Sequence, residues 1–127
     1  MQTIFVRCQA VFIFLNVALF AENWPGWRGP LGTKKAEGEN YPITWSRDKN
    51  VRWRFDLPER GNSSPVLWGD QLYAINQSGD AFVLRAAPKF ELLATNALGE
   101  KTQSPMAFAG GDIFVRSYKS LWCISVK

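Results

Sequence analysis

The chain has 127 residues, of which 46% are hydrophobic and 14% aromatic, so it can form the core of one domain and is not disordered by composition. Its net charge is +4 at pH 7, but the longest basic run is Lys34-Lys35, and nucleic-acid binding is therefore not expected. The absence of histidine excludes imidazole metal ligands, the commonest general base and a Ser-His-Asp triad.

Residues 1–21 are predicted to be a signal peptide. Arg7 precedes the apolar stretch QAVFIFLNVALFA, and Ala21 is a small residue that suits the cleavage position. The alternative is an uncleaved membrane anchor, but the apolar run is short for a bilayer span and is interrupted by Gln9 and Asn16. The mature chain is expected to be exported to the periplasm or the extracellular space, without a stable membrane span.

Residues 22–50 are predicted to form an N-terminal arm without regular structure. Its stretch NWPGWRGPLGTKK contains three glycines and two prolines, which disfavour a helix and a central strand. Trp24, Trp27 and Arg28 could form an aromatic site for a sugar or a cation. The favoured interpretation is that both tryptophans pin the arm onto the domain, with Arg28 stacked or hydrogen-bonded nearby.

The stretch of residues 51–86 organises the chain, because its pattern of short strands and turns recurs 40 or 41 residues later. The matching positions are Ser64-Pro65 with Ser104-Pro105, Trp68 with Phe108, Leu72-Tyr73 with Ile113-Phe114, and Phe82-Val83-Leu84 with Trp122-Cys123-Ile124. A period near 40 residues with about four strands in each unit is typical of β-propeller blades. The predicted fold class is therefore all-β.

Apolar and charged side chains alternate along residues 51–57, which predicts a half-buried strand. Further strands are predicted at residues 65–68, 71–75, 81–85, 90–96, 104–108, 113–116 and 121–126, with no helix outside the leader. The second unit lacks a fourth strand, whereas residues 51–57 are a fourth-type strand without a unit. We therefore expect the two to combine, so that residues 51–127 form two four-stranded antiparallel blades of a partial propeller.

The segments AENWPGWRGP and ITWSRDKNVRWRFDLPERGNSSPVLWGD resemble the first-blade region of the pyrroloquinoline-quinone-like (PQQ-like) β-propeller repeat proteins. The segment from Leu72 to Ile124 is similar to the last blades of that family, and the resemblance covers about residues 21–124. Members of the family carry several more blades between these parts, so the resemblance implies an internally shortened member. It also implies an exported, non-catalytic module that acts as a protein-interaction or binding scaffold.

Two blades cannot enclose a central channel, because propellers use about four to eight. Stacked repeats bury their faces against their neighbours, and about three are needed for stability alone. We therefore expect self-association, in which several chains complete one propeller ring.

Two other functions are considered: a fragment of a quinoprotein dehydrogenase, and a non-functional remnant of a longer propeller protein. The resemblance implies that a dehydrogenase would have a closed ring, a calcium site and usually adjacent cysteines. Asp70, Asp80 and Asp112 lie at predicted turns, where aspartate is favoured for backbone reasons. We therefore predict no metal-binding residues, no cofactor-binding residues and no cofactor.

Nucleophilic side chains are also interpreted as structural. Ser64 and Ser104 begin predicted strands, and the chain has no histidine to activate them. Cys123 lies among apolar residues and is expected to be a buried structural thiol rather than a nucleophile. The chain is therefore predicted not to be an enzyme and to have no catalytic residues.

Overall fold

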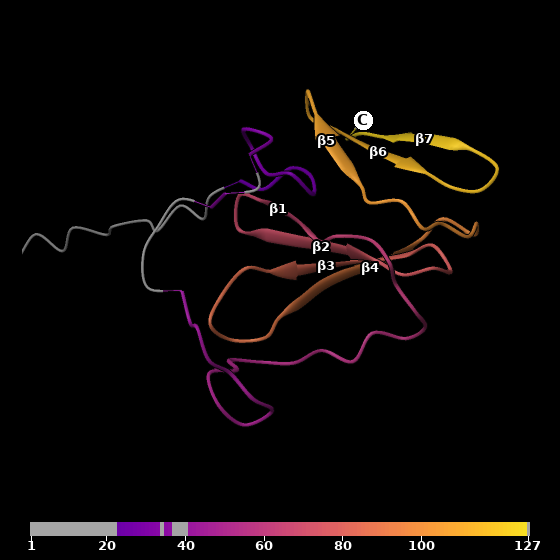
Figure 1. Ribbon diagram of the computed structural model, residues 1–127. Helices are drawn as coiled ribbons and strands as arrows, with labels where there is room; N and C mark the ends of the chain where they lie inside the picture. Colours follow the sequence, from indigo (N-terminus) through magenta and orange to yellow (C-terminus); the bar gives the residue numbers. More distant parts are fainter. Residues whose placement is uncertain (1–22, 34, 37–40, 127) are drawn as a thin grey trace, which may run out of the picture.

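A computed structural model describes residues 23–33, 35–36 and 41–126, so the predicted signal peptide at residues 1–21 lies outside the described residues (Figure 1). All regular elements in the described part are β-strands, which confirms the predicted all-β class. None of the described segments is a helix long and apolar enough to cross a membrane.

The strands form two antiparallel sheets. Sheet 1 contains β1 (Val66–Trp68), β2 (Gln71–Ile75), β3 (Asp80–Arg85) and β4 (Leu92–Ala97), hydrogen-bonded in that order. Sheet 2 contains β5 (Ala107–Ala109), β6 (Asp112–Arg116) and β7 (Leu121–Ile124), also in chain order. Each sheet is therefore a meander in which every strand lies beside its neighbour in the sequence.

The turns show why these residues form meanders. Gly69-Asp70 joins β1 to β2 and Gly110-Gly111 joins β5 to β6, with positive φ angles at all three glycines, as tight hairpin loops require. The next turn in each sheet is closed by a side chain. Asn76 Oδ1 and Ser117 Oγ each accept a hydrogen bond from the backbone N–H of the residue that ends the turn, at 2.9 and 2.8 Å.

The hairpin registers of the two sheets match. Leu67 pairs with Leu72 in sheet 1, and Phe108 pairs with Ile113 in sheet 2. The structural counterpart of Phe108 is therefore Leu67, and the sequence match of Phe108 with Trp68 is wrong by one position. The reason is that sheet 2 has one more residue before its first strand, so the spacing grows from 40 at the Ser-Pro pairs to 41 in the hairpins.

The hydrophobic core lies between the two sheets, which pack face to face (Figure 1). Its buried cluster consists of Val66, Ile75, Met106 and Val115, each at most 4% exposed. Tyr73 of sheet 1 meets Phe108 of sheet 2 edge to face, with ring centroids 4.7 Å apart. Burial of this shared cluster is the main apolar contact that joins the sheets.

The structure contradicts the prediction for residues 51–57. They form no strand, no backbone hydrogen bond joins them to another described residue, and they run along the side of sheet 1 that faces away from sheet 2 (Figure 1). Phe55 lies edge-on to Phe82 with centroids 5.6 Å apart, and Trp53 donates from Nε1 to the Ala87 carbonyl at 3.0 Å. The aromatic side chains cover the apolar face of sheet 1 beside them. Strand β7, the edge strand of the sheet that they were predicted to complete, lies on the other side of sheet 1 (Figure 1). Sheet 2 therefore has three strands.

Candidate interaction surface

The described part of the N-terminal arm is attached to sheet 1. The backbone of Trp24 pairs with Leu67 through hydrogen bonds of 2.6 and 3.0 Å, and Asn23 Oδ1 accepts from the Gly69 N–H at 2.6 Å. Trp24 thus pins the arm, which confirms the favoured interpretation for this tryptophan, whereas pinning by Trp27 stays a prediction. Trp27 is 51% exposed and carries the guanidinium of Arg28 over its ring, 4.8 Å from the centroid.

The alternative aromatic site of the arm has a structural basis. An open cavity of about 430 Å³ lies beside the arm. Its lining includes Trp24, Trp27 and Tyr41, together with Leu67 and Leu72 of sheet 1. No described contact identifies what this cavity would bind, so the sugar or cation site stays a prediction.

The outer face of sheet 1, which is directed away from sheet 2, is apolar and covered. Its main apolar side chains are Leu67, Leu72, Phe82 and Leu84, which share one face because side chains alternate along a strand. Phe82 and Leu84 are only 4% and 3% exposed. Phe55 lies over Phe82 and Trp24 is paired with Leu67, so the segments that precede β1 cap this face.

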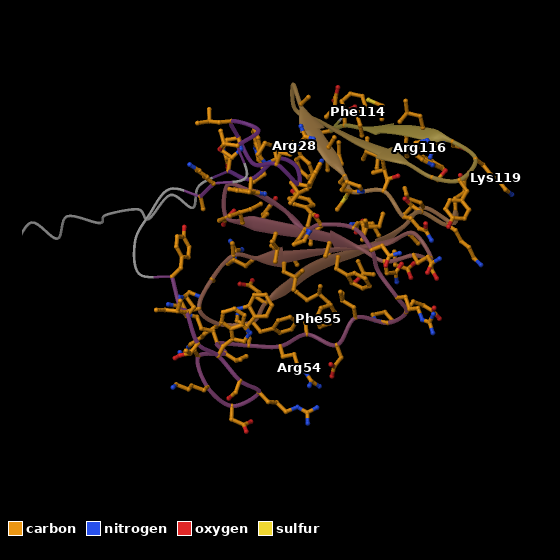
Figure 2. All side chains as sticks on the ribbon, viewed as in Figure 1. Arg28, Arg54, Phe55, Phe114, Arg116 and Lys119 are labelled. Carbon is orange, nitrogen blue, oxygen red and sulfur yellow. The ribbon has the colours of Figure 1, made fainter. Side chains whose placement is uncertain are left out.

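The two sheets present equivalent faces in the same direction. Tyr73 of β2 points toward sheet 2, where it contacts Phe108. The hairpin register makes Phe114 of β6 the counterpart of Tyr73. Ile113 and Val115 on either side of Phe114 pack into the core, so Phe114 points away from sheet 1 (Figure 2). The face with which sheet 1 binds sheet 2 therefore recurs on the far side of sheet 2.

We call this far side the sheet 2 outer face; its apolar residues are Ala107, Ala109, Phe114, Leu121 and Cys123. Leu121 is 74% exposed, and no described strand packs on the face. The row that pairs Ala107, Phe114 and Cys123 across sheet 2 matches the row of Val66, Tyr73 and Val83 across sheet 1. Exposed apolar faces of this kind mark interaction sites, so the sheet 2 outer face is the candidate functional surface.

Cys123 is exposed, and the prediction of a buried thiol is therefore wrong. Its register counterpart is Val83, which lies on the face that sheet 1 turns toward sheet 2. The apolar surroundings of Cys123 in the sequence indicated a sheet face that can be buried. In the described chain no third sheet covers that face.

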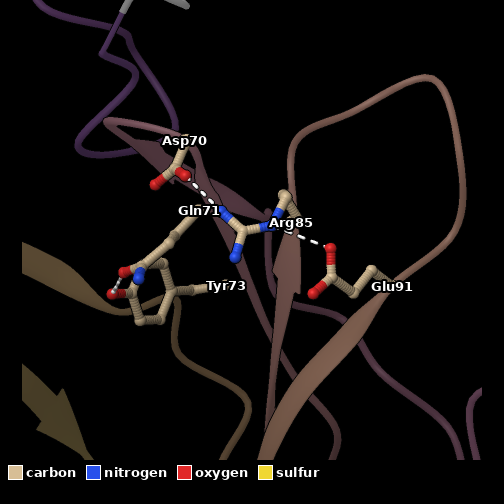
Figure 3. A network of polar contacts seen from close by, with 5 residues as sticks. All are labelled: Asp70, Gln71, Tyr73, Arg85 and Glu91. Carbon is tan, nitrogen blue, oxygen red and sulfur yellow. Dashed lines mark hydrogen bonds and ion pairs between the residues drawn. The ribbon is translucent and has the colours of Figure 1, made fainter.

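Figure 3 shows a polar network at one end of sheet 1. Arg85 donates from Nη1 to Asp70 and from Nε to Glu91, the second bond measuring 2.8 Å; the Glu91 bond contributes most to raising the pKa of the guanidinium. Tyr73 donates from its hydroxyl to Gln71, and burial, followed by the charge of Asp70, raises the Tyr73 pKa. The network cross-links strand ends, which gives Asp70 a structural role.

Of the other predicted turn residues, Asp80 hydrogen-bonds with the Asn76 side chain and Asp112 begins β6. The described residues contain no group of three or more histidine, cysteine, aspartate or glutamate side chains placed to hold a metal ion. Ser64 lines the cavity beside the arm, and the Ser104 N–H donates to Thr102 Oγ1 at 3.1 Å.

A second polar cluster, which no sequence pattern singles out, surrounds Glu100. Its carboxylate accepts hydrogen bonds from the hydroxyls of Ser117 and Ser120, the second at 3.1 Å. The Ser117 bond is the main cause of a lowered Glu100 pKa; burial opposes it, and Ser120, Lys119 and the Trp122 side chain lower the pKa further. The Trp122 Nε1 is buried and lies close enough to Glu100 to lower its pKa, but no acceptor among the described residues meets hydrogen-bond geometry with it. The cluster ties the chain entering sheet 2 to the β6–β7 turn.

The Glu100→Gln variant is expected to show a weaker dependence of stability on acid pH than the wild type. The carboxyl pKa is lower in the folded chain than its ordinary value of 4.5, so its contribution to stability is complete above pH 4.5 and is lost as the pH falls through the folded pKa. Melting temperatures measured by circular dichroism from neutral pH downward test this. Asp48→Asn, in an exposed loop, is the matched control. If the melting temperatures of wild type and Glu100→Gln fell by the same amount as the pH was lowered below 4.5, the expectation would be contradicted.

A scan against models of protein families finds no match to this chain, and a search of curated proteins finds none either.

Proposed function

We propose that this chain is an exported, non-catalytic PQQ-like propeller repeat module that acts as a protein-binding scaffold. The observation that carries the proposal is the recurrence of the sheet-binding face. Tyr73 uses this face inside the chain to contact sheet 2, and its counterpart Phe114 presents the same face outward. In this proposal each sheet is a blade, and the next sheet to stack on Phe114 belongs to a binding partner.

Equivalent hydrogen bonds support the interpretation of the sheets as repeated blades. Gln77 N–H donates to the Arg60 carbonyl at 2.6 Å, and Tyr118 N–H donates to the Lys101 carbonyl at 2.9 Å. Both bonds join the turn after the second strand of a sheet to the chain that leads into the same sheet. Stacked repeats in which each unit contacts only its neighbours have this regularity. The stacking orientation and the path of the chain into each sheet are therefore consistent with radial blades.

The chemistry of the sheet 2 outer face defines the kind of partner. Its centre is apolar, with Phe114 flanked by Ala107 and Cys123 across the strands, whereas Asp112 and Arg116 lie toward the two ends of β6. An apolar centre with a polar rim is the usual arrangement of a protein interface. The expected partner is therefore a protein that presents an apolar sheet face, and further copies of this chain satisfy that description.

The test is capture of proteins from the exported fraction by the immobilised wild-type chain and by the Phe114→Asp variant. The wild type is expected to retain a partner, and the variant is expected to lose most of it because a carboxylate would be desolvated in the contact. Ile43→Asp is the matched control, since Ile43 is a 94% exposed apolar residue that belongs to neither sheet. Equal capture by wild type and Phe114→Asp would contradict the proposal, and so would no capture by any form.

The quinoprotein alternative predicts a different ligand and is tested separately. Titration of the purified chain with pyrroloquinoline quinone and calcium is expected to leave its tryptophan fluorescence unchanged. The one expected decrease is caused by the quinone absorbing light, and free tryptophan in solution shows the same decrease. Saturable quenching that depends on calcium would contradict the non-catalytic proposal.

A further inference from the structure

In the described chain, residues 51–57 have no strand neighbour on either side, and strand β7 has none at its outer edge. Residues 51–57 alternate apolar and charged side chains, but their backbone makes no hydrogen bond to another described residue. Strand β7 is the last strand in the order of sheet 2, so its outer edge has no described partner. Unpaired strand edges are templates for pairing with an extended segment of another chain.

The hydrogen-bond pattern identifies which groups of β7 face the open edge. Ser117 N–H donates to the Ser120 carbonyl at 2.9 Å, so this pair is hydrogen-bonded across the β6–β7 turn. Hydrogen-bonded and non-hydrogen-bonded pairs alternate along antiparallel strands. The N–H and C=O groups of Leu121 and Cys123 therefore point outward, away from β6. They can pair with an added strand without losing a bond inside sheet 2.

The repeat indicates which segment fits that edge. Strand β4 leads into β5 as residues 51–57 lead into β1, and the matched bonds from Gln77 to Arg60 and from Tyr118 to Lys101 show that the chain leads into both sheets with the same geometry. Strand β4 is the fourth strand of the sheet that packs on sheet 2. The segment that leads into a sheet is thus the fourth strand of the neighbouring sheet that packs on it. Residues 51–57 lead into sheet 1, so they correspond to the fourth strand of a sheet that would pack on the outer face of sheet 1. Sheet 2 is the described sheet that lacks a fourth strand.

Backbone strain marks the two ends of this segment. Asn50 has a φ of 60° and Glu59 a φ of 64°, and they are the two non-glycine residues with positive φ in the described chain. Asparagine tolerates this conformation, but glutamate in it is uncommon. The positive φ angles therefore lie one residue before and two residues after residues 51–57, at positions where rotation would re-aim the whole segment.

We infer, building on the proposed scaffold function, that copies of this chain associate head to tail. Residues 51–57 of one copy pair with the outer edge of β7 in a second copy, and the outer face of sheet 1 of the first copy packs on the sheet 2 outer face of the second. In a single chain, residues 51–57 stay on sheet 1 through Trp53 and Phe55. The two contacting surfaces differ, so the association is heterologous and produces a ring or an open filament.

The register of this pairing follows from the repeat. A shift of 41 residues, the spacing of Arg60 and Lys101 in the matched bonds, places Trp53 at the position of Ala94. Ala94 pairs with Val83, whose counterpart in sheet 2 is Cys123. Trp53 of one copy is therefore expected to lie opposite Cys123 of its neighbour.

Disulfide trapping tests this register. All forms carry Cys8→Ser; one also carries Trp53→Cys and Cys123→Ser, and the other keeps Cys123. Under mild oxidation the mixture is expected to give at least about tenfold more covalent dimer than a control mixture in which Trp53→Ser with Lys89→Cys replaces Trp53→Cys, because cross-strand geometry brings only the first pair within disulfide reach. Equal cross-linking by the two mixtures would overturn the inference.

Light scattering provides a second readout. The wild-type mass is expected to rise with concentration to at least that of two chains, whereas Cys123→Pro is expected to keep the mass of one chain with an unchanged circular dichroism spectrum. Proline at this position removes the outward N–H group without breaking a hydrogen bond inside sheet 2. A wild-type mass of one chain at every concentration would overturn the head-to-tail inference, although Phe114-dependent capture would still support the scaffold function. Equal capture by wild type and Phe114→Asp, or no capture by any form, would overturn the scaffold function itself.

Discussion

Replacement of Gly79 by alanine is expected to lower the free energy of unfolding by at least about 3 kcal/mol. Gly79 has a φ of 90°, and a Cβ added there would lie 2.1 Å from the Glu100 carbonyl oxygen. That carbonyl belongs to the chain that passes from sheet 1 to sheet 2. It cannot move away easily, because Leu98 N–H donates to the Gly79 carbonyl and Thr102 N–H donates to the Gln77 carbonyl, each at 3.0 Å.

Gly111→Ala is the matched control for this prediction. Gly111 has nearly the same φ, 88°, but an added Cβ would meet no atom within 4 Å. This variant is expected to lose only the conformational free energy of a left-handed alanine, about 1–2 kcal/mol. Urea unfolding of both variants measures the difference. Equal losses in the free energy of unfolding would show that the close approach of Gly79 to the Glu100 carbonyl adds no cost for a side chain at position 79.

The sequence predicted the strands well wherever local pattern decides the outcome. Strand β2 occupies residues 71–75 as predicted, because its apolar run lies between two turn signals that the chain itself supplies. Strand β5 begins three residues later than predicted and β7 ends two residues earlier, since chain ends of short strands carry little periodic signal.

The location of residues 51–57 could not be predicted from their alternation. Alternation gives an extended segment with one apolar side, but it does not say which apolar surface that side will cover. In the described chain, Phe55 covers Phe82 on the nearest open face. Cys123 illustrates the same limit, because its burial depends on whether a neighbouring sheet is present rather than on its own strand. Glu100 carries no local signal at all, since its partners lie 17 and 20 residues further along the chain.

Met106→Ala is expected to lower the free energy of unfolding by about 2–5 kcal/mol, the usual range for truncating a buried methionine. Met106 is 3% exposed and packs with Val66, Ile75 and Val115 in the one buried cluster that the two described sheets share. A cavity there removes contacts from both sheets at once, and neither sheet can close it without shifting against the other. A domain of this size has about 5–15 kcal/mol of total stability, so the loss is a large fraction of it.

Met106→Leu separates the cavity from the substitution itself, because it nearly conserves volume and is expected to cost less than about 1.5 kcal/mol. Urea unfolding followed by tryptophan fluorescence and by far-ultraviolet circular dichroism measures both variants. If the cluster joins the sheets into one cooperative unit, the two signals of the wild type coincide and Met106→Ala shifts them together. Equal stability of the alanine and leucine variants would mean that Met106 does not hold the sheets together. The face of sheet 1 that carries Tyr73 would then lose its status as a sheet-binding face, and the same status could no longer be assigned to Phe114.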